Sequence, residues 1–236
     1  MFYTIKPGDT IYAIASEYQT TVSEILASNP GLTPYNLIVG QQIIIPAPSR
    51  APDWAGISIN EMKLINTLRS LWEQHVAWTR MAIVSAEAGS PDLRFTVDRL
   101  LRNPSDMADA LRPLYGDQKA DTFGRLVYEH LSIALQLVNA AKAGNTQAAR
   151  DAEQRWYQNA DKIAAYLNTI NPYINKDDFR RMFHTHLALT KDEAVNRLNR
   201  NYARDIALYD RIENQALEMA DMMSEGIVRQ FPNMFR

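Results

Sequence analysis

The sequence predicts a small α+β module (strand, helix, helix, strand) followed by an all-α helical bundle. Strand-like segments occur only near the two ends of the first 47 residues. A proline-bearing stretch of small and polar residues follows, and from Ser58 onward only helical periodicity recurs, between proline and glycine stops. A chain of 236 residues is long enough for two folded units. We therefore expect a module at 1–47, a linker at 48–57 and a helical bundle domain at 58–236.

The first half of the module is predicted to be a strand and a helix. Residues 2–6 alternate between apolar and polar, and Pro7-Gly8 closes this strand with a turn. Asp9 stands where an N-cap is needed, because its carboxylate can accept the unpaired N–H groups of a first helical turn. Apolar residues then recur at helical spacing as far as Tyr18.

The second half is predicted to be a short helix and a strand. Thr21 or Ser23 can cap the helix. It must end at Asn29-Pro30-Gly31, because proline has no N–H to donate and glycine tolerates left-handed backbone. Residues 41–46 then read as a strand that Pro46 ends.

Taken together in this order and spacing, these residues resemble the LysM family. The segments that carry the resemblance are Tyr3–Ile11, Ile14-Ala15, Asn29-Pro30, Leu37–Gln41 and Ile45-Pro46. The resemblance implies a two-stranded antiparallel sheet with both helices on one side. It also implies a shallow groove between two loops, in which the N-acetylglucosamine units of peptidoglycan or chitin lie.

The groove residues that the resemblance implies come from two loops. They are Gly8, Asp9, Thr10 and Ile11 in the first loop, and Asn29, Pro30, Gly31, Leu37 and Ile38 in the second. Loops on a rigid scaffold can offer backbone donors and acceptors beside an apolar floor, which is what an acetamide group needs. The alternative is that these residues only form turns and caps, and for Asp9 we expect capping to be the main role. A single shallow groove binds weakly, so several copies on one polymer would raise the affinity.

The remainder of the chain is predicted to form a series of helices. Ser58 caps the first long one, which ends at Ala88, and Glu61 completes a capping box. The further helices are expected at 92–101, 104–111, 117–143, 146–169 and 176–189, with Thr146 as one cap, and a last one is expected from Thr190 to about 229. Four of these are long enough to span a domain, so an antiparallel bundle with accessory helices is the simplest architecture.

Large apolar side chains of this region are expected in the bundle core, among them Trp72, Trp156, Tyr166, Met219 and Met222. The region resembles helical proteins of spore-forming Gram-positive bacteria that have no known activity. That resemblance implies no functional residues.

All four histidines of the chain lie in the helical region, each near acidic residues. A bundle can bring imidazole and carboxylate groups together from different helices to bind a divalent metal. His75, His130 and His186 are the candidate ligands, with Asp161, Asp210 and Glu213 as further carboxylates. No spacing matches an established ligand motif. The alternative, and the favoured one, is that the three histidines are half-buried residues with local hydrogen bonds.

Composition and motifs exclude several classes of function. The formal charge is -2 with basic and acidic residues mixed along the chain, so no nucleic-acid-binding surface is expected. Cysteine is absent, which rules out disulfides, thiolate metal sites and cysteine nucleophiles. There is no glycine-rich phosphate loop and no Gly-x-Ser-x-Gly elbow. The sequence therefore leans against an enzyme and predicts no cofactor beyond the possible divalent metal.

Three hypotheses for function remain open. In the first, the LysM module localises the chain to the cell wall or spore, and the bundle packs against other copies or other coat and wall proteins. The second is a metal-binding or metal-dependent helical bundle targeted to the wall, and the third is a phage-tail module. Residues 1–6 lack the basic and apolar regions of a signal peptide, and no apolar run could cross a bilayer. We therefore expect synthesis in the cytoplasm without a signal peptide, no membrane insertion, and association with the spore or wall.

Overall fold

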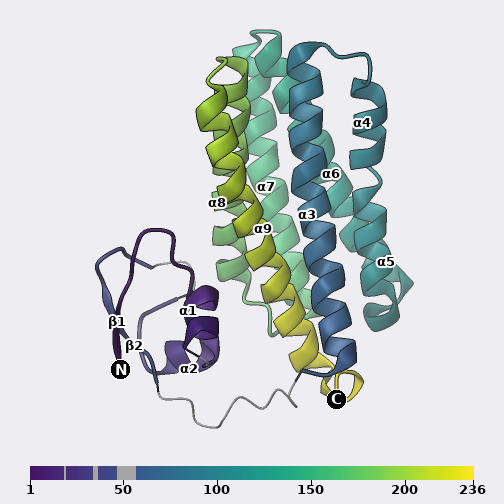
Figure 1. The fold of residues 1–236 in the computed structure, drawn as a ribbon. Coiled ribbons are helices and arrows are strands. Elements are labelled where there is room, and N and C mark those ends of the chain that lie inside the picture. The colour runs from purple at the N-terminus through teal and green to yellow at the C-terminus, as the bar shows by residue number, and fades with distance from the viewer. Residues whose placement is uncertain (19, 34–36, 47–56) are drawn as a thin grey trace. The chain divides into compact units, whose positions relative to one another are not determined.

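The computed structural model describes residues 1–18, 20–33, 37–46 and 57–236, and the chain divides into two compact units, Met1–Ile57 and Ser58–Arg236 (Figure 1). The linker expected at 48–57 lies, apart from Ile57, outside the described residues.

The first unit contains a two-stranded antiparallel sheet and two short helices, as the sequence predicts. Tyr3 pairs with Ile43, and both side chains are buried beneath the helices together with Ile5 and Ile45. On each strand the neighbouring residues are exposed, so buried and exposed side chains alternate as expected for a strand with one buried face. The elements are β1 (Phe2–Thr4), α1 (Ile11–Glu17), α2 (Val22–Ala27) and β2 (Gln42–Ile44).

The caps of the two short helices differ from expectation in one case. Thr21 caps α2 with a complete capping box, in which Glu24 N–H donates to the Thr21 hydroxyl and Glu24 accepts from the Thr21 N–H. For α1, however, it is Thr10 whose hydroxyl accepts the Ala13 N–H, at 3.1 Å. Asp9 is not the cap, because its carboxylate is already engaged by the preceding turn.

The second unit is all-helical, and the expected bundle is confirmed (Figure 1). Five of its described helices exceed 20 residues, one more than the sequence analysis predicted. Its elements are α3 (Ile59–Ala88), α4 (Leu93–Leu100), α5 (Asn103–Tyr115), α6 (Asp117–Lys142), α7 (Thr146–Ile170), α8 (Lys176–Leu198), α9 (Tyr202–Gln230) and the 3-10 turn η1 (Pro232–Met234).

Several helix boundaries show where local signals succeed and fail. Ser58 caps α3 as predicted, with its hydroxyl accepting from Glu61 N–H at 3.1 Å. Thr190 does not start a helix: it lies inside α8, and its hydroxyl donates to the carbonyl of His186. Asn145, not Thr146, supplies the capping oxygen of α7. A threonine within a helix can always bond to the preceding turn, so its presence alone does not mark a boundary.

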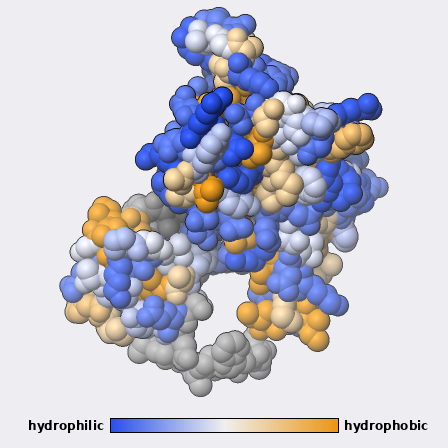
Figure 2. Space-filling model, turned by 45° about the horizontal axis from the view of Figure 1, so that its top comes forward, coloured by the Kyte–Doolittle hydropathy of each residue, from blue (hydrophilic) through white to orange (hydrophobic). Residues whose placement is uncertain are grey.

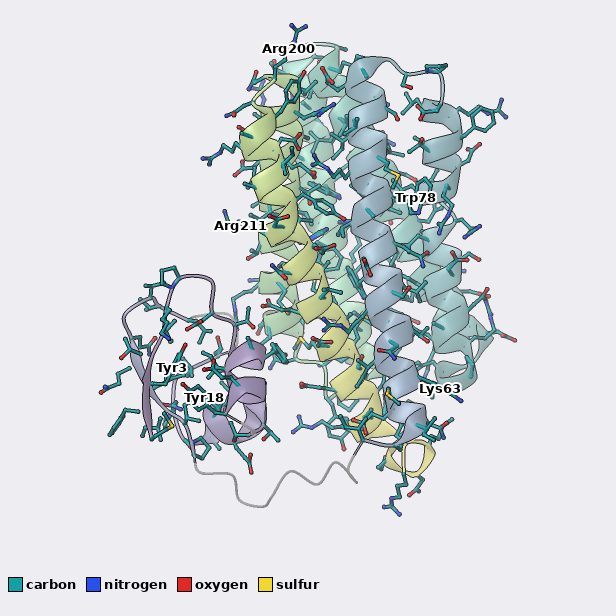
Figure 3. The ribbon with its side chains drawn as sticks, in the orientation of Figure 1. Tyr3, Tyr18, Lys63, Trp78, Arg200 and Arg211 are labelled. Atoms are coloured by element: carbon teal, nitrogen blue, oxygen red, sulfur yellow. The ribbon has the colours of Figure 1, made fainter. Side chains whose placement is uncertain are left out.

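The helical unit is built from three hairpins in series, α3 with α4–α5, α6 with α7, and α8 with α9. Each hairpin turns at a residue with left-handed backbone: Gly89 (φ 65°), Gly144 (φ 70°) and Arg200 (φ 59°). A histidine precedes each of these turns by the same number of residues, at positions 75, 130 and 186. The hairpins therefore repeat one plan, and the third departs from it by using arginine where the others use glycine; Figure 3 shows Arg200 at that turn.

The expected core residues are largely buried. Trp72, Trp156 and Met219 are at most 3% exposed, whereas Tyr166 and Met222 are only half-buried, and Met223 takes the core position. Hydrophilic residues cover most of the face seen in Figure 2, with hydrophobic residues at the lower end of the helical unit. Ile59 and Met62 are exposed where α3 begins, and Asn60 hydrogen-bonds the carbonyl of Met234 there. None of the described helices is long and apolar enough to cross a membrane.

Candidate functional site

The first loop of the small unit is organised by the Asp9 carboxylate. It accepts the Lys6 N–H and the Tyr3 hydroxyl, both at 2.7 Å. The bond from Tyr3 to this carboxylate raises the pKa of the tyrosine to about 12. The Tyr3 ring packs edge-on against Tyr18, with centroids 5.4 Å apart. Both side chains are labelled in Figure 3. Asp9 thus holds the turn that leads from β1 into α1.

The same loop leaves backbone polar groups unpaired. Gly8 has φ 88°, a conformation that a side chain would strain. Its N–H and C=O, and the N–H of Thr10, make no hydrogen bond with any described residue. Gly8 is exposed, so these groups can take an external donor or acceptor.

The second loop is attached to the sheet by Asn29. Its side-chain amide donates to the carbonyls of Ile25 and Ile44, at 2.6 and 2.7 Å, and its oxygen accepts the Ile44 N–H at 2.7 Å. Asn29 therefore covers the outer edge of β2, and its side chain has a structural role. The LysM resemblance placed it among the groove residues, with a turn as the alternative role.

The two loops meet at one end of the sheet. Ile5 extends the pairing beyond β1, since Gly40 N–H donates to its carbonyl at 2.8 Å and its own N–H reaches Gln41 at 2.9 Å. Gln41 N–H in turn closes a turn on the Ile38 carbonyl at 2.9 Å. The chain that enters the Gly8 turn therefore lies beside the chain that leaves the Ile38 turn.

The predicted groove residues differ in what they can offer a ligand. Ile11 is 0% exposed and belongs to the core, and Leu37 packs against that core, so only their backbones are available. Pro30 and Gly31 are exposed, and the Ile38 side chain is 66% exposed. Ile38 is thus the predicted residue best placed to contact an N-acetyl methyl group. Contact of these residues with a glycan stays a prediction.

In the helical unit, the three candidate histidines share one pattern. His75, His130 and His186 are each at most 3% exposed. The Nδ1 of each lies 3.0–3.2 Å from a side-chain amide oxygen 28 or 29 residues further along the chain. The amide nitrogen then donates to the backbone carbonyl four residues before the histidine. For His75, His130 and His186 in turn, the amide and the carbonyl that it bonds belong to Asn103 and Leu71, Asn159 and Leu126, and Gln215 and Met182.

This arrangement defines the state of each imidazole. The amide nitrogen is engaged by a carbonyl, so the amide oxygen faces the ring, and Nδ1 must donate to it. The lone pair then lies on Nε2. Burial lowers the pKa of His75 to about 4 and of His186 to about 3, and the pKa of His130 also lies well below its usual value. The three rings are therefore neutral at pH 7.

The rings lie close together but are also packed against aromatic residues. The ring centroids of His75 and His186 are 5.9 Å apart. His130 lies against Trp156 and Phe183, at 5.4 and 5.0 Å, and its Nε2 is buried without a hydrogen-bond partner among the described residues.

Within the described parts of the chain, no group of three or more His, Asp or Glu side chains is arranged to hold a metal ion. Of the further carboxylates, Asp161 bonds instead to His184, at 2.8 Å, and Asp210 is exposed. Metal binding by the three histidines stays a prediction.

Sequence reasoning missed the amide partners of the histidines. The usable signal was the repeated spacing, in which an asparagine or glutamine follows each histidine by 28 or 29 residues. A second group that it missed is a buried charge cluster. Arg80 bonds to Glu193 and, at 2.6 Å, to Asp205, which also faces Arg197. Since these residues belong to α3, α8 and α9, the cluster ties the three helices together.

Comparison with known families identifies the small unit. The model of the LysM domain family matches residues 3–46, and those residues form a LysM domain. The remainder of the chain lies outside this match. No solved structure matches the chain.

Curated relatives share short segments with the chain. A putative L,D-transpeptidase YkuD of Bacillus licheniformis is 38% identical over 63 residues, which are 25% of this chain and 38% of the relative. A cortical fragment-lytic enzyme of Bacillus subtilis is 50% identical over 44 residues, 19% of this chain and 10% of the enzyme. A secreted LysM effector ELP2 of Colletotrichum higginsianum is 43% identical over 44 residues, 19% of this chain and 25% of the effector. The chain thus spans well under half the length of these relatives.

Proposed function

We propose that this chain binds N-acetylglucosamine polymers of the peptidoglycan or chitin type through its LysM domain and thereby holds the helical domain at a bacterial cell wall or spore. The observation that supports this most is the LysM match over residues 3–46. The geometry is compatible with it, because backbone groups of Gly8 and Thr10 that have no partner among the described residues lie on the loop that adjoins the exposed Ile38 turn. An acetamide would find hydrogen-bond partners on one loop and an apolar contact on the other.

A matched pair of substitutions tests the proposal. Ile38→Asp removes the apolar contact of the groove, whereas Phe2→Asp makes the same change on the exposed face of β1; the two side chains are 66% and 67% exposed. Loss of one aliphatic contact costs about 1 kcal/mol, so roughly fivefold weaker binding is expected for Ile38→Asp alone. The measurement is co-sedimentation of the full chain with insoluble peptidoglycan over a range of glycan amounts. Equal retention of both variants and the unchanged protein would contradict the proposed groove.

Localisation to the spore is the finer part of the proposal. It is supported by the similarity to a cortical fragment-lytic enzyme and to a putative sporulation-specific glycosylase YdhD, both of Bacillus subtilis. A fluorescent fusion followed through sporulation in a Bacillus host tests it. The expected result is a ring of fluorescence around the forespore, and a signal that stays diffuse throughout would count against it.

The metal-binding alternative has one observation in its favour: three neutral histidines lie in one buried region, and the Nε2 of His130 has no hydrogen-bond partner among the described residues. The absence of a suitable ligand group among the described residues weighs against it. Elemental analysis of protein purified without a histidine tag decides between the two. A stoichiometric metal that disappears in His130→Gln would support the alternative, and a metal-free protein would end it.

A further inference from the structure

A cavity of about 370 Å³ lies at the end of the helical unit where α6 and α7 are joined. It is lined by residues of α3, α6, α7 and α8, whose arrangement is visible in Figure 1, and by Leu100 of α4. Many of the residues that line it are short, and the alanines among them are Ala82, Ala134, Ala141, Ala149 and Ala194. Larger side chains at these positions would close the space, since protein interiors are otherwise packed without voids.

The cavity leads from solvent into the core. At its inner end lie Leu100, Leu131 and Trp156, which are at most 3% exposed. At its outer end lie Gly144 and Val195, which are exposed. The apolar part of a ligand bound here would be removed from water.

Most of the cavity lining is hydrocarbon, but its ionisable residues carry a net positive charge. Lys191 is paired with Glu153, its Nζ lying 2.6 Å from the carboxylate. The Arg150 guanidinium hydrogen-bonds only the neutral Gln147 amide, at 3.0 Å, and has no acidic partner among the described residues. Arg150 therefore gives this side of the cavity one uncompensated positive charge.

We propose that the cavity binds a single-chain amphiphile with an anionic head group, such as a medium-chain fatty acid. A volume of about 370 Å³ suits a ligand of small-molecule size, such as a single hydrocarbon chain with its head group. The hydrocarbon tail occupies the alanine-lined interior, and the carboxylate lies at the mouth beside Arg150. A cavity of this size with an apolar lining and few polar groups is typical of small-molecule sites. The inference is independent of glycan binding, because every lining residue belongs to the helical unit.

Titration calorimetry of the full chain tests the proposal, with ligands kept below their micelle concentrations. Dodecanoate is the probe, and dodecyltrimethylammonium has the same tail with a cationic head. Ala134→Phe fills the cavity and is expected to weaken dodecanoate binding at least tenfold. Ala165→Phe is the matched control, because Ala165 is also half-buried on a helix of the same unit but does not line the cavity.

The charge of the head group is tested separately with Arg150→Gln. This exposed residue can change without disturbing the core, so the variant decides the question even if Ala134→Phe does not fold. It is expected to weaken dodecanoate severalfold and to leave dodecyltrimethylammonium unchanged. No binding of dodecanoate to the unchanged protein, binding that Ala134→Phe leaves intact in a folded chain, or equal effects of Arg150→Gln on both ligands would each overturn the proposal.

Discussion

Replacing His75 by glutamine is expected to remove a defined part of the pH dependence of the helical unit's stability. His75 is buried and neutral, and burial lowers its pKa to about 4, against about 6.5 for an unfolded chain. Below pH 6.5 the unfolded state therefore binds a proton that the folded state does not. Its contribution to stability is complete above pH 6.5 and is lost as the pH falls towards 4.

The magnitude follows from the distance between the assay pH and 6.5. An assay at pH 5 lies about 1.5 pH units below the pKa of the unfolded histidine. Each of these units stabilises the unfolded state by about 1.4 kcal/mol, so the unfolding free energy falls by roughly 2 kcal/mol. At pH 7 the histidine is mostly neutral in both states, so the loss of stability is close to zero. The drop in unfolding free energy from pH 7 to pH 5 should thus be about 2 kcal/mol smaller in His75→Gln than in the unchanged protein.

Comparing the two drops isolates this one group. Buried carboxylates also titrate in this range: burial raises the pKa of Glu193 to about 7, which makes the folded state more stable as the pH falls. Such groups act equally in both proteins and cancel in the difference. His186→Gln serves as an independent repeat, because His186 has the same burial and the same type of amide partner.

The assay is urea unfolding at pH 7 and pH 5, followed by far-UV circular dichroism, which reports on the helical unit. Glutamine is expected to lower stability at pH 7 by about 1–2 kcal/mol, because its contacts with Asn103 are less complete. If both proteins lose the same free energy between the two pH values, His75 is not held neutral by burial, and the reasoning fails.

Three further outcomes are expected, each measured by chemical unfolding at pH 7. Gly226→Ala should destabilise the helical unit by about 1–3 kcal/mol, because the added Cβ would lie 2.5 Å from the side chain of Ile174; an unchanged midpoint would show that the contact relaxes freely. Arg200→Gly should stabilise it by about 0.5–1 kcal/mol by removing a left-handed arginine, and a lower stability would mean that the arginine makes compensating contacts. Asn29→Ala should destabilise the LysM domain by about 1–3 kcal/mol through its lost bonds to Ile44, read from the NMR signals of that domain, and no change would refute its bridging role.

Helix termini illustrate how far local sequence signals reach. Ser58 was predicted to cap α3 and does so. Its hydroxyl accepts the N–H of Glu61, only three residues along the chain, so the bond needs no distant residue. Thr190 was predicted to start a helix and does not, because the α8 backbone can continue through a threonine whose hydroxyl bonds to the preceding turn. Asp9 was expected to cap α1, but Tyr3 and Lys6, neighbours only through the turn, engage its carboxylate instead.

The histidines show that contacts between residues far apart in the sequence could not be predicted from local signals. Their occurrence on helices was readable from the sequence, but the favoured interpretation, half-buried rings with local hydrogen bonds, is wrong. Each ring is at most 3% exposed, and its amide partner lies 28 or 29 residues along the chain. Which residues satisfy them depends on the hairpin that folds Asn103 back onto α3, or Gln215 onto α8. The cavity likewise arises from alanines on four different helices, and no window of sequence contains it.

By itself the sequence determined the LysM domain, the two classes of fold and the positions of most helices, because turns, caps and periodicity are properties of neighbouring residues. The tertiary structure alone decided that Asn29 closes a sheet edge, that three histidines are held neutral by burial while each bonds to a side-chain amide, and that a cavity remains between the hairpins. These features depend on which side chains meet across helices. Such meetings are set by the packing of the whole unit and are not encoded in any local pattern.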